Sequence, residues 1–503
     1  MRTLSAALLA AQITGESPTL RVVLTMTGET TYVYTGERVK SIEHPEQDDI
    51  QTALIELDNS DNVLTALDLG GYDCAVAYGH VTGITISAWQ AGHVYSPGDV
   101  VKPTTPNGYQ YRCTAGGTSH ATTEPTWANA YGTTITDGTV TWTFDGEQGS
   151  EYSECAPLKV VFPMPVSSHV GLSCFISCAG KITNRLSEST ASENYDNTSS
   201  GYTAKGYINQ ILSGDAGALA CFAGETGITV SWDSEAAIVD TYVPAGDVDV
   251  SEGDSRMNLV KTLCRLTGQC FRPENDGELH FIVPTSTGTT YDYQYTLADG
   301  GHIFFNKSYR KTVFYPNKIT VKSNNDAGYE GSATDAYSYG KDPCPRVRRY
   351  TVSDNTQATA IAQAEIDRMA LDAERGTATV PLNCGQEVWD YIKFTDVNEG
   401  GQVRTGNVQR LTRRVNWRQR VWRMELTLGK PGMVSTLGTT APAFTESSSG
   451  VTGGNYATRD QVETALALLD LHIDDDSPHL NMKSLALDRL TVKSFFQAPG
   501  RYD

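Results

Sequence analysis

Between Trp89 and Gly146 the chain is divided into short β-type runs by glycine, proline and asparagine turn signals. The runs are Asp99–Val101, Tyr109–Cys113 and Val140–Phe144. Short strands separated by turns in this way are typical of a compact β-module. Strand-like segments before and after it indicate one larger sheet domain. We therefore predict a module at 87–150, inserted at a hairpin tip, where an insertion disrupts little backbone pairing.

The predicted module contains more aromatic side chains than so small a core can bury. Rigid aromatic faces beside hydroxyls and amides suit stacking against sugar rings or against a protein partner. The module resembles the small domains, similar to chitin-binding domains, that recur in tail proteins of bacteriophages, and this implies a host surface glycan as ligand. The alternative is a structural or docking module with Trp89 and Trp142 in its core. The candidate glycan- or partner-binding residues are Trp89, Tyr95, Tyr109, Tyr111, Trp127 and Trp142.

The composition favours β structure in several domains. A chain of 503 residues is too long for one ordinary domain. Its 46 Gly and 25 Tyr, with many Thr and Val, favour strands and turns. The formal net charge of −20 argues against a sequence-wide affinity for nucleic acid and suits a soluble, abundant particle component.

Neither a membrane span nor a signal peptide is predicted. No apolar stretch approaches the length that crosses a bilayer. The start, Met1–Gln12, has one early positive charge and no convincing cleavage pattern, so a short packing helix is favoured. Its apolar face would comprise Leu4, Ala7, Leu8 and Ala11.

The ten cysteines are scattered singly along the chain. Cys174 lies four residues from Cys178, and Cys264 lies six from Cys270, but no second pair or histidine stands at zinc spacing. The expectation is therefore a large protein, assembled in the cytosol, with buried free thiols. One disulfide between Cys264 and Cys270 is the alternative.

Periodicity and turn chemistry predict the remaining elements. Alternating apolar residues indicate a β-hairpin at 20–34 around Gly28, and Asn275-Asp276-Gly277 indicates a second hairpin. Helical spacing predicts helices at 202–212, 256–267 and 356–374, the second ending at Gly268. Further strands are expected at 53–58, 74–80, 158–162, 315–321, 377–382, 391–395, 406–416 and 421–428.

Several loose motifs accompany this order of elements. They are Ile55-Glu56-Leu57-Asp58-Asn59, a hairpin from Gly268 through Phe271 and Gly277 to Phe281, His302-Ile303-Phe304, and Tyr315-Pro316-Asn317. Over roughly residues 1–435 the arrangement resembles the baseplate hub or tail-tip proteins of tailed bacteriophages. The resemblance implies a mainly β, multidomain α+β fold with barrel-like sheet domains, assembled as a homotrimeric ring around the DNA channel.

The same resemblance implies the partners and the location. Neighbours would be the tail tube or distal tail protein, the tape measure, and a spike or fibre, with DNA passing transiently. The chain would be a virion component, assembled in the bacterial cytoplasm. The insert and the C-terminal tail depart from the family plan and are expected to contact the host or neighbouring proteins.

We divide the chain into an N-terminal β-domain with an insert, a central domain, a closing domain and a tail. The boundaries are 1–86 plus 151–200 for the first β-domain, 87–150 for the module, 201–345 for the central α+β domain, 346–435 for the closing helix plus β-domain, 436–454 for a Ser/Thr/Gly-rich linker and 455–503 for the C-terminal segment.

Residues 460–473 predict an amphipathic helix with an apolar stripe close to heptad spacing. Two heptad turns cannot stand alone, so the helix is expected to dock on a partner or to self-associate. Its docking residues would be Val462, Leu466, Leu469 and Ile473. The adjoining run His472–His479 is interpreted as a polar linker rather than a metal site.

No catalytic constellation, cofactor motif or metal set is recognised, so we predict that the chain is not an enzyme. The sequence contains no Gly-x-Ser-x-Gly, no His-Glu-x-x-His and no phosphate-binding loop ending in Gly-Lys-Ser/Thr. The acidic residues at 247–254 fall in an expected loop and are interpreted as solvated surface.

One basic run lies near the end of the last β-segment, interleaved with Trp417 and Trp422. Strand alternation would place several of its arginines on one face. In a ring this face could line the channel and attract DNA phosphates. The alternative is an ordinary salt-bridged sheet face. The candidate channel-lining residues are Arg410, Arg413, Arg414, Arg418 and Arg420.

The sequence thus predicts a structural protein of a phage tail tip or baseplate, a trimeric hub that closes the tail tube and anchors spike or fibre proteins. The alternative is a peripheral carbohydrate-binding adhesin or receptor-binding protein, with the module as its binding end. A glycan-degrading tailspike would require long parallel β-helix repeats, and no such periodicity is visible.

Overall fold

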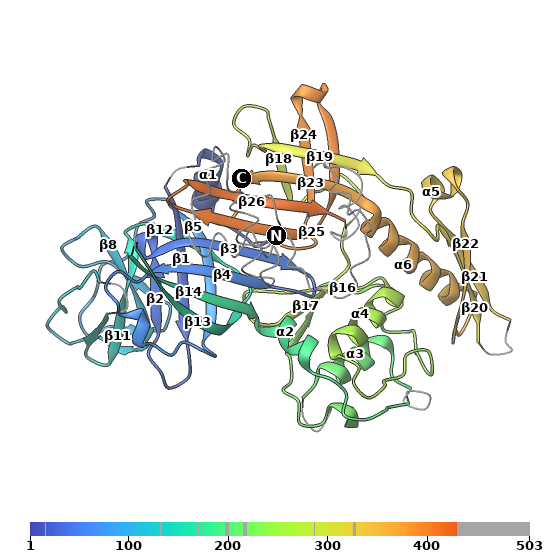
Figure 1. Ribbon diagram of the computed structural model, residues 1–503, viewed down its shortest axis with the longest axis horizontal. Coiled ribbons are helices and arrows are strands. Elements are labelled where there is room, and N and C mark those ends of the chain that lie inside the picture. The colour runs from blue at the N-terminus through green and yellow to red at the C-terminus, as the bar shows by residue number, and fades with distance from the viewer. Residues whose placement is uncertain are drawn as a thin grey trace, which may run out of the picture. The chain divides into compact units, whose positions relative to one another are not determined.

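The computed structural model describes residues 1–429, apart from residues 16, 131–132, 170, 197–200, 215–218, 286 and 325–327. Strands make up 41% of it and helices 18%, so the expected mainly β fold class is confirmed (Figure 1). The predicted linker and the C-terminal docking helix lie outside the described residues. The residues concerned are Val462, Leu466, Leu469, Ile473 and the run His472–His479.

One sheet of 14 strands contains both the first and the last β-segments of the chain. Its main path is β19-β23-β26-β25-β3-β4-β14-β13-β5-β1-β2, with β12 paired to β5, and β24 paired to β18 and β25. The early elements are β1 (Pro18–Thr25), β2 (Tyr32–Thr35), η1 (Gly36–Arg38), β3 (Val39–Gln47), β4 (Thr52–Asp58), η2 (Leu64–Ala66), β5 (Asp73–Val81), β12 (Ser150–Glu154), β13 (Leu158–Ser168) and β14 (Gly171–Gly180). The late elements are β18 (Tyr293–Thr296), β19 (Asn306–Lys311), β23 (Glu374–Pro381), β24 (Tyr391–Asp396), η4 (Val397–Glu399), β25 (Gln402–Asn416) and β26 (Val421–Leu428).

The first two strands form the hairpin predicted at 20–34. β1 and β2 pair antiparallel across a turn that contains Gly28, whose φ of 83° favours glycine. Leu20, Val22 and Leu24 alternate along β1 and are fully buried, as the period of a half-buried strand requires. This prediction is confirmed.

Strands β25 and β3 join the two ends of the described chain. They pair antiparallel, with Val415 opposite Ile42 and Arg414 opposite Glu43. β3 also pairs with β4, and β25 also pairs with β26. Backbone hydrogen bonds therefore run directly between the segment expected as the N-terminal β-domain and the segment expected as the closing β-domain.

The inserted segment forms a sheet of its own, in the order β10-β11-β8-β7. β5 ends at Val81 and β12 begins at Ser150, and these two residues lie opposite each other in an antiparallel pair. The segment therefore leaves and re-enters the large sheet at one hairpin. Its strands are β6 (Val94–Tyr95), β7 (Val100–Val101), β8 (Tyr109–Ala115), β9 (Gly117–Thr118), β10 (Thr134–Asp137) and β11 (Val140–Glu147).

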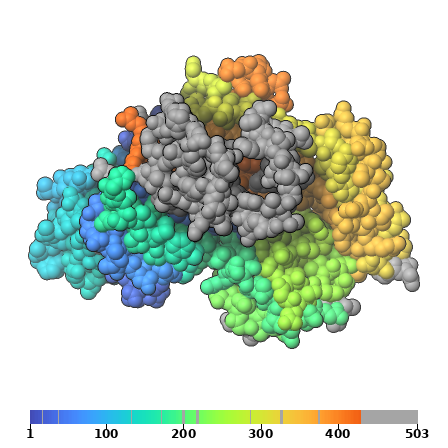
Figure 2. All heavy atoms as spheres, in the orientation of Figure 1, coloured from blue at the N-terminus to red at the C-terminus, as the bar shows by residue number. Residues whose placement is uncertain are grey.

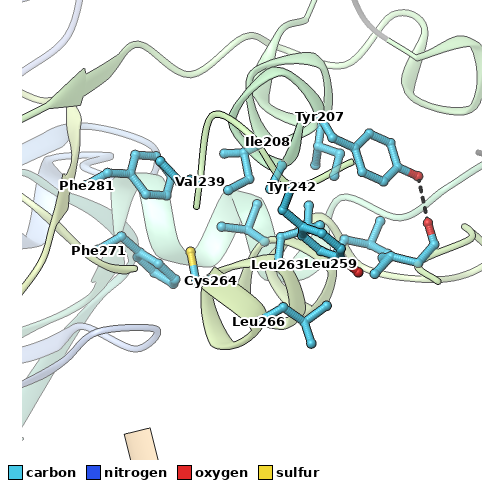
Figure 3. Packing of buried hydrophobic residues seen from close by; sticks show 14 of the residues in the cluster. Tyr207, Ile208, Val239, Tyr242, Leu259, Leu263, Cys264, Leu266, Phe271 and Phe281 are labelled. Carbon is cyan, nitrogen blue, oxygen red and sulfur yellow. Dashed lines mark hydrogen bonds between the residues drawn. The ribbon is translucent and has the colours of Figure 1, made fainter. Parts of the chain in front are cut away.

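A helical lobe follows the early strands, and the sheet β15-β17-β16 belongs to it. Its longest helix, α4, begins after Ser255, whose Oγ accepts from the amide of Asn258, and ends at Gly268 with a φ of 78°, as predicted. Figure 3 shows the packing of α3 and α4, where the hydroxyl of Tyr207 donates to the carbonyl of Val248 at 3.2 Å. The elements are α2 (Lys181–Glu188), α3 (Ala204–Leu212), η3 (Ala220–Phe222), β15 (Val230–Trp232), α4 (Arg256–Thr267), β16 (Cys270–Pro273) and β17 (Leu279–Ile282).

A small sheet, β21-β20-β22, packs against α6. Ile319 and Val321 of β20 are fully buried, in the same hydrophobic core as the apolar residues of α3, α4 and α6. α6 matches the helix predicted at 356–374. The elements are β20 (Lys318–Ser323), β21 (Glu330–Thr334), α5 (Ala336–Lys341), β22 (Pro345–Tyr350) and α6 (Asn355–Ala373).

The N-terminal helix α1 (Ala6–Thr14) is present, but its buried face differs in part from the prediction. Leu8 and Ala11 are buried, whereas Ala7 is exposed and Leu4 precedes the helix. Ser5 supplies the N-terminal cap, because its Oγ accepts from the amide of Leu8. None of the helices in the described part of the chain has the length and apolar character needed to cross a membrane.

All ten cysteines are among the described residues, and all are free thiols. Nine are buried and Cys344 is partly exposed, so the expectation of buried free thiols is confirmed. The alternative disulfide between Cys264 and Cys270 is not formed. Cys270 instead accepts a hydrogen bond at 3.1 Å from Nη1 of Arg368 on α6.

Candidate functional site

A buried ion pair connects β25 to β3. Arg413 is 0% exposed, and its Nη1 donates to Oε2 of Glu46 at 2.6 Å. Its Nη2 donates to the carbonyl oxygen of Gln386, also at 2.6 Å. Arg413 lies opposite His44 in the strand pair, two residues from Glu46, so the register brings the two charges together. The pair therefore joins the first β-segment to the last.

The placement of Arg413 corrects the prediction that it lines a channel. Leu411, Arg413 and Val415 alternate on the buried face of β25, whereas Arg414 projects from the opposite face. The period of two therefore separates Arg413 from Arg414. The guanidinium group of Arg413 points into the core, where no channel can reach it without opening the sheet.

The other arginines of the basic run lie outside the core. Arg414 is partly exposed and pairs with Glu43 at 3.0 Å. This pair matches the alternative of a salt-bridged sheet face. Arg410 is half-buried, and Arg418 and Arg420 are exposed at the turn between β25 and β26. For these three residues the channel-lining role stays a prediction.

Opposite charges keep both His44 and Glu46 ionised inside the junction. Burial by itself raises the pKa of Glu46, but the positive charges of Arg413 and His44 outweigh burial and hold that pKa well below its usual value. Burial by itself lowers the pKa of His44, but Glu46 and Cys155 raise it to about 9. Nδ1 of His44 also lies 3.2 Å from the hydroxyl of Tyr78.

His44, Glu46 and Cys155 each offer one ligand atom within 4.8 Å of the others. Such residue types can hold a metal ion or form a thiol–imidazole–carboxylate set. Burial raises the pKa of the Cys155 thiol, but Arg2 and Arg413 outweigh burial and lower it. These two guanidinium groups already balance the negative charge that would attract a cation. The cavity beside the set measures about 10 Å³, room for one water molecule, so the geometry suits a structural charge network.

The sequence analysis missed this network, although the strands carry a signal for it. Ile42, His44 and Glu46 alternate along β3 and are all buried. On β25 the buried Arg413 likewise stands between Leu411 and Val415. Charged residues in phase with buried apolar residues of a strand indicate a paired charge in the core.

A second group of charges connects the helical lobe to the loop before β24. Arg272 of β16 lies 3.1 Å from Asp390 and 3.2 Å from Glu387. Burial raises the pKa of Asp390 to about 6, although the charge of Arg272 opposes this. Nη1 of Arg272 also donates to the carbonyl of Val388 at 3.0 Å. The lobe and the late strands are therefore joined by charge as well as by packing.

Four of the six candidate aromatic residues form the core of the module. Trp142 and Tyr111 are fully buried, and Tyr95 and Trp89 are 6% and 7% exposed. The indole N–H groups of Trp89 and Trp142 both donate to Oδ2 of Asp137, at 2.7 and 3.0 Å. A sugar ring needs an accessible aromatic face, so it cannot stack on these four side chains unless the module opens.

The other two aromatic residues keep part of their surface exposed. Tyr109 and Trp127 are half-buried, and the Trp127 ring lies 4.5 Å from the ring of Tyr111. The burial of Trp89 and Trp142 agrees with the alternative of a structural module. Glycan binding through Tyr109 and Trp127 stays a prediction.

A buried arginine ties the module to the large sheet. Arg21 of β1 lies 3.3 Å from Asp145 of β11, and its guanidinium carbon is 4.4 Å from the ring centre of Tyr152. Burial by itself lowers the pKa of Arg21, and the charge of Asp145 outweighs this and raises it. Gln110 donates to Asp145 at 3.2 Å and accepts from the amide of Gly149 at 3.0 Å. An ion pair and hydrogen bonds thus hold the module to the large sheet at the point where it is inserted.

The fold of the chain is similar to those of several solved tail proteins. It is similar to a tail protein from Neisseria meningitidis MC58, with a TM-score of 0.47 and 10% identity over 83% of this chain and 97% of that one. It is also similar to the 43 kDa tail protein of prophage MuSo2 from Shewanella oneidensis, with a TM-score of 0.42 and 13% identity over 81% and 97%.

A further similarity is to the E. coli c3393 protein, described as a component of the type VI secretion system with structural similarity to the T4 bacteriophage tail proteins gp27 and gp5. The TM-score is 0.36 and the identity 10%, over 81% of this chain and 76% of that one. No family model matches the chain, and no curated protein sequence matches it. Identities at this level compare folds and assign no function to the chain.

Proposed function

We propose that the chain is a structural, non-enzymatic component of the distal end of a bacteriophage tail, where three copies form a hub that closes the tail tube and anchors spike or fibre proteins. The observation that carries the proposal is the junction of β3 and β25. One sheet and the buried Arg413–Glu46 pair tie the first β-segment to the last. A body joined in this way transmits a pull on an attached fibre instead of absorbing it between loosely linked domains.

The order of elements supports the same proposal. The strand at 53–58, α4 with its hairpin, α6 and the closing strands all form, in the order that the sequence resemblance to hub proteins implies. In this role the chain contacts the tail tube or distal tail protein, the tape measure, and the spike or fibre. DNA passes transiently through the ring, and the protein belongs to the virion after assembly in the bacterial cytoplasm.

The mass of the purified chain in solution, measured by light scattering, tests the ring. A species of three times 54.5 kDa supports the hub. A truncated chain of residues 1–437 shows which part holds the copies together. Loss of the trimer on truncation would assign the contacts to residues 438–503. A full chain that stays monomeric contradicts the trimeric hub and favours a peripheral adhesin.

Glycan binding by the module is the second candidate role, and the half-exposed faces of Tyr109 and Trp127 are the observation in its favour. Titration of the full chain with chitin oligosaccharides, followed by tryptophan fluorescence, tests this role. Binding that is lost in Trp127→Ala and kept in a variant at Trp232, a half-buried tryptophan of the helical lobe, supports a carbohydrate-binding adhesin. The absence of any saturable binding contradicts it for this class of sugar.

A further inference from the structure

Charge is distributed very unevenly between two parts of the chain. Residues 188–254, here called the acidic lobe segment, contain twelve Asp or Glu and a single lysine, Lys205. Residues 304–350 contain nine Lys or Arg against four Asp or Glu. A chain with a formal net charge of −20 therefore carries a net positive stretch. Such asymmetry points to a partner surface of opposite charge.

The positive stretch includes the small sheet, and alternation divides β20 between two faces. Ile319 and Val321 are buried on the side of α6 and the hydrophobic core. Lys318 and Lys322 therefore project from the other face. Because the inner face packs against α6, the outer face points away from that helix.

The neighbouring strand β22 adds to this outer face. Its parallel register with β20 places Arg349 beside Lys322, and Val347 lies two residues earlier on the same face. Val347 is 56% exposed, although it is apolar. Lys318, Lys322, Val347 and Arg349 together are here called the basic sheet face. An exposed valine surrounded by charges has the composition of a small interface centre with a polar rim.

The charges of the basic sheet face are only partly balanced within one copy. Lys322 pairs with Glu330 at 3.1 Å, and Nζ of Lys318 lies 6.0 Å from the ring centre of Tyr339. Neither Lys318 nor Arg349 forms an ion pair with a residue in the described ranges. Figure 2 shows the gold atoms of this part of the chain reaching the surface at the right of the view, with the green atoms of the lobe below them.

The acidic lobe segment offers carboxylates that also lack a cation. Glu193 and Glu252 are exposed on two adjacent stretches, which a bridge between Tyr195 and Val250 holds together. The amide of Glu252 donates to Oδ1 of Asn194 at 2.8 Å. Neither glutamate forms an ion pair within the part of the chain that the structure describes. Asp247 of the same segment accepts hydrogen bonds from Asn324 and Thr351, directly after β20 and β22, so the segment borders one end of the small sheet. Glu193 and Glu252 nevertheless form no ion pair with the basic sheet face among the described residues of one copy.

We propose that the basic sheet face of one copy binds the acidic lobe segment of a second copy of this chain. The two surfaces differ, so the contact is head-to-tail and repeats from copy to copy until a ring closes. The inference rests on the proposed trimeric hub and names the surfaces that hold it. Val347 supplies the desolvated centre, and the charges supply orientation and a fast encounter.

Nucleic acid is the rival occupant, because phosphates also bind exposed lysine and arginine. A second copy is favoured for two reasons. Every copy of the chain carries a complementary acidic surface, and the net charge of −20 of the whole chain repels a polyanion. The charges are therefore better matched by another copy than by DNA.

Charge reversal in the full chain tests the contact, with sedimentation equilibrium at low and at moderate salt as the measurement. We expect Lys318→Glu with Arg349→Glu to raise the dissociation constant on the order of a hundredfold, because like charges then face each other. Glu193→Lys with Glu252→Lys should do the same. The chain with all four changes should assemble again, since the charges are exchanged and not removed. Its recovery also shows that the single-surface variants fold.

The control variant is Lys159→Glu with Lys181→Glu, which changes the net charge by the same amount at exposed lysines outside both surfaces. This variant should leave the dissociation constant unchanged. A trimer that is insensitive to both reversals overturns this inference and leaves the proposed hub standing. A wild-type chain that remains monomeric overturns both. Oligomers unaffected by Lys318→Glu with Arg349→Glu, together with loss of binding to a short DNA duplex in that variant, would assign the face to nucleic acid instead.

Discussion

Replacement of Arg413 by methionine perturbs the junction of β3 and β25 with little change of side-chain length. The Glu46 carboxylate, 5% exposed, then loses a partner at 2.6 Å. Removing one partner of a buried ion pair costs about 3–5 kcal/mol, because an uncompensated charge remains in the core. His44, 3.2 Å from Glu46, stays and offsets part of this loss. We therefore expect Arg413→Met to lower the free energy of unfolding by about 3 kcal/mol.

Two further variants separate the buried pair from a general effect of losing an arginine. Arg414→Met removes the exposed partner of Glu43 on the opposite face and should cost about 0–1 kcal/mol, as surface pairs do. Arg413→Met combined with Glu46→Leu removes both buried charges. Replacing a buried pair by apolar side chains is often close to neutral, so the double variant should recover most of the stability.

Urea unfolding, followed by tryptophan fluorescence and far-ultraviolet circular dichroism, provides the measurement. Trp422 lies close to the junction, with its ring centre 6.1 Å from that of Tyr78, and reports on its opening. The first transition is the one to compare, because a chain of this size need not unfold in a single step. The reasoning is refuted if Arg413→Met and Arg414→Met destabilise equally, or if the double variant is less stable than Arg413→Met alone.

Three other predictions address pH, the module and a close backbone approach. Burial and the nearby His80 lower the pKa of His302 to about 4, against about 6.5 in an unfolded chain. The folded state therefore resists protonation of His302. The contribution of this residue to the free energy of unfolding is complete above pH 6.5 and falls by up to about 3 kcal/mol towards pH 4. Urea unfolding at pH 7 and pH 5 should show this loss, and His302→Gln should reduce it. Asp137→Ala removes the acceptor of two buried indole N–H groups and should destabilise the module by about 2–4 kcal/mol. The red shift of tryptophan emission that accompanies unfolding should then occur at a lower urea concentration. Asp137→Asn keeps an acceptor oxygen and should lose less stability. Gly79→Ala would place a methyl group 1.9 Å from the carbonyl oxygen of Glu151, so β12 must move away from β5. We expect the free energy of unfolding to fall by about 1–3 kcal/mol. An unchanged midpoint of thermal or urea unfolding would contradict this close approach of the two strands.

Local patterns in the sequence were sufficient for many of the elements but not for their partners. The hairpin at Gly28, the cap at Gly268 and the helix at 356–374 follow from turn chemistry and hydrophobic period, which involve residues close together along the chain. The face of α1 was only partly correct, since Ala7 is exposed and Leu4 lies outside the helix. Alternation alone could have assigned Arg413 to the buried face, but the density of arginines suggested a single basic surface.

The sequence by itself determined that the chain is mainly β, that a turn-rich module lies between two strand segments, and where the helices predicted at 202–212, 256–267 and 356–374 lie. Each of these depends on a local preference of the backbone or on the period at which apolar residues recur. Only the tertiary structure decided that β3 pairs with β25, that Arg413 meets Glu46, and that most of the module's aromatic rings face inward. Arg413 and Glu46 stand 367 residues apart, and no local period encodes which distant strand completes a sheet or which buried charge balances another.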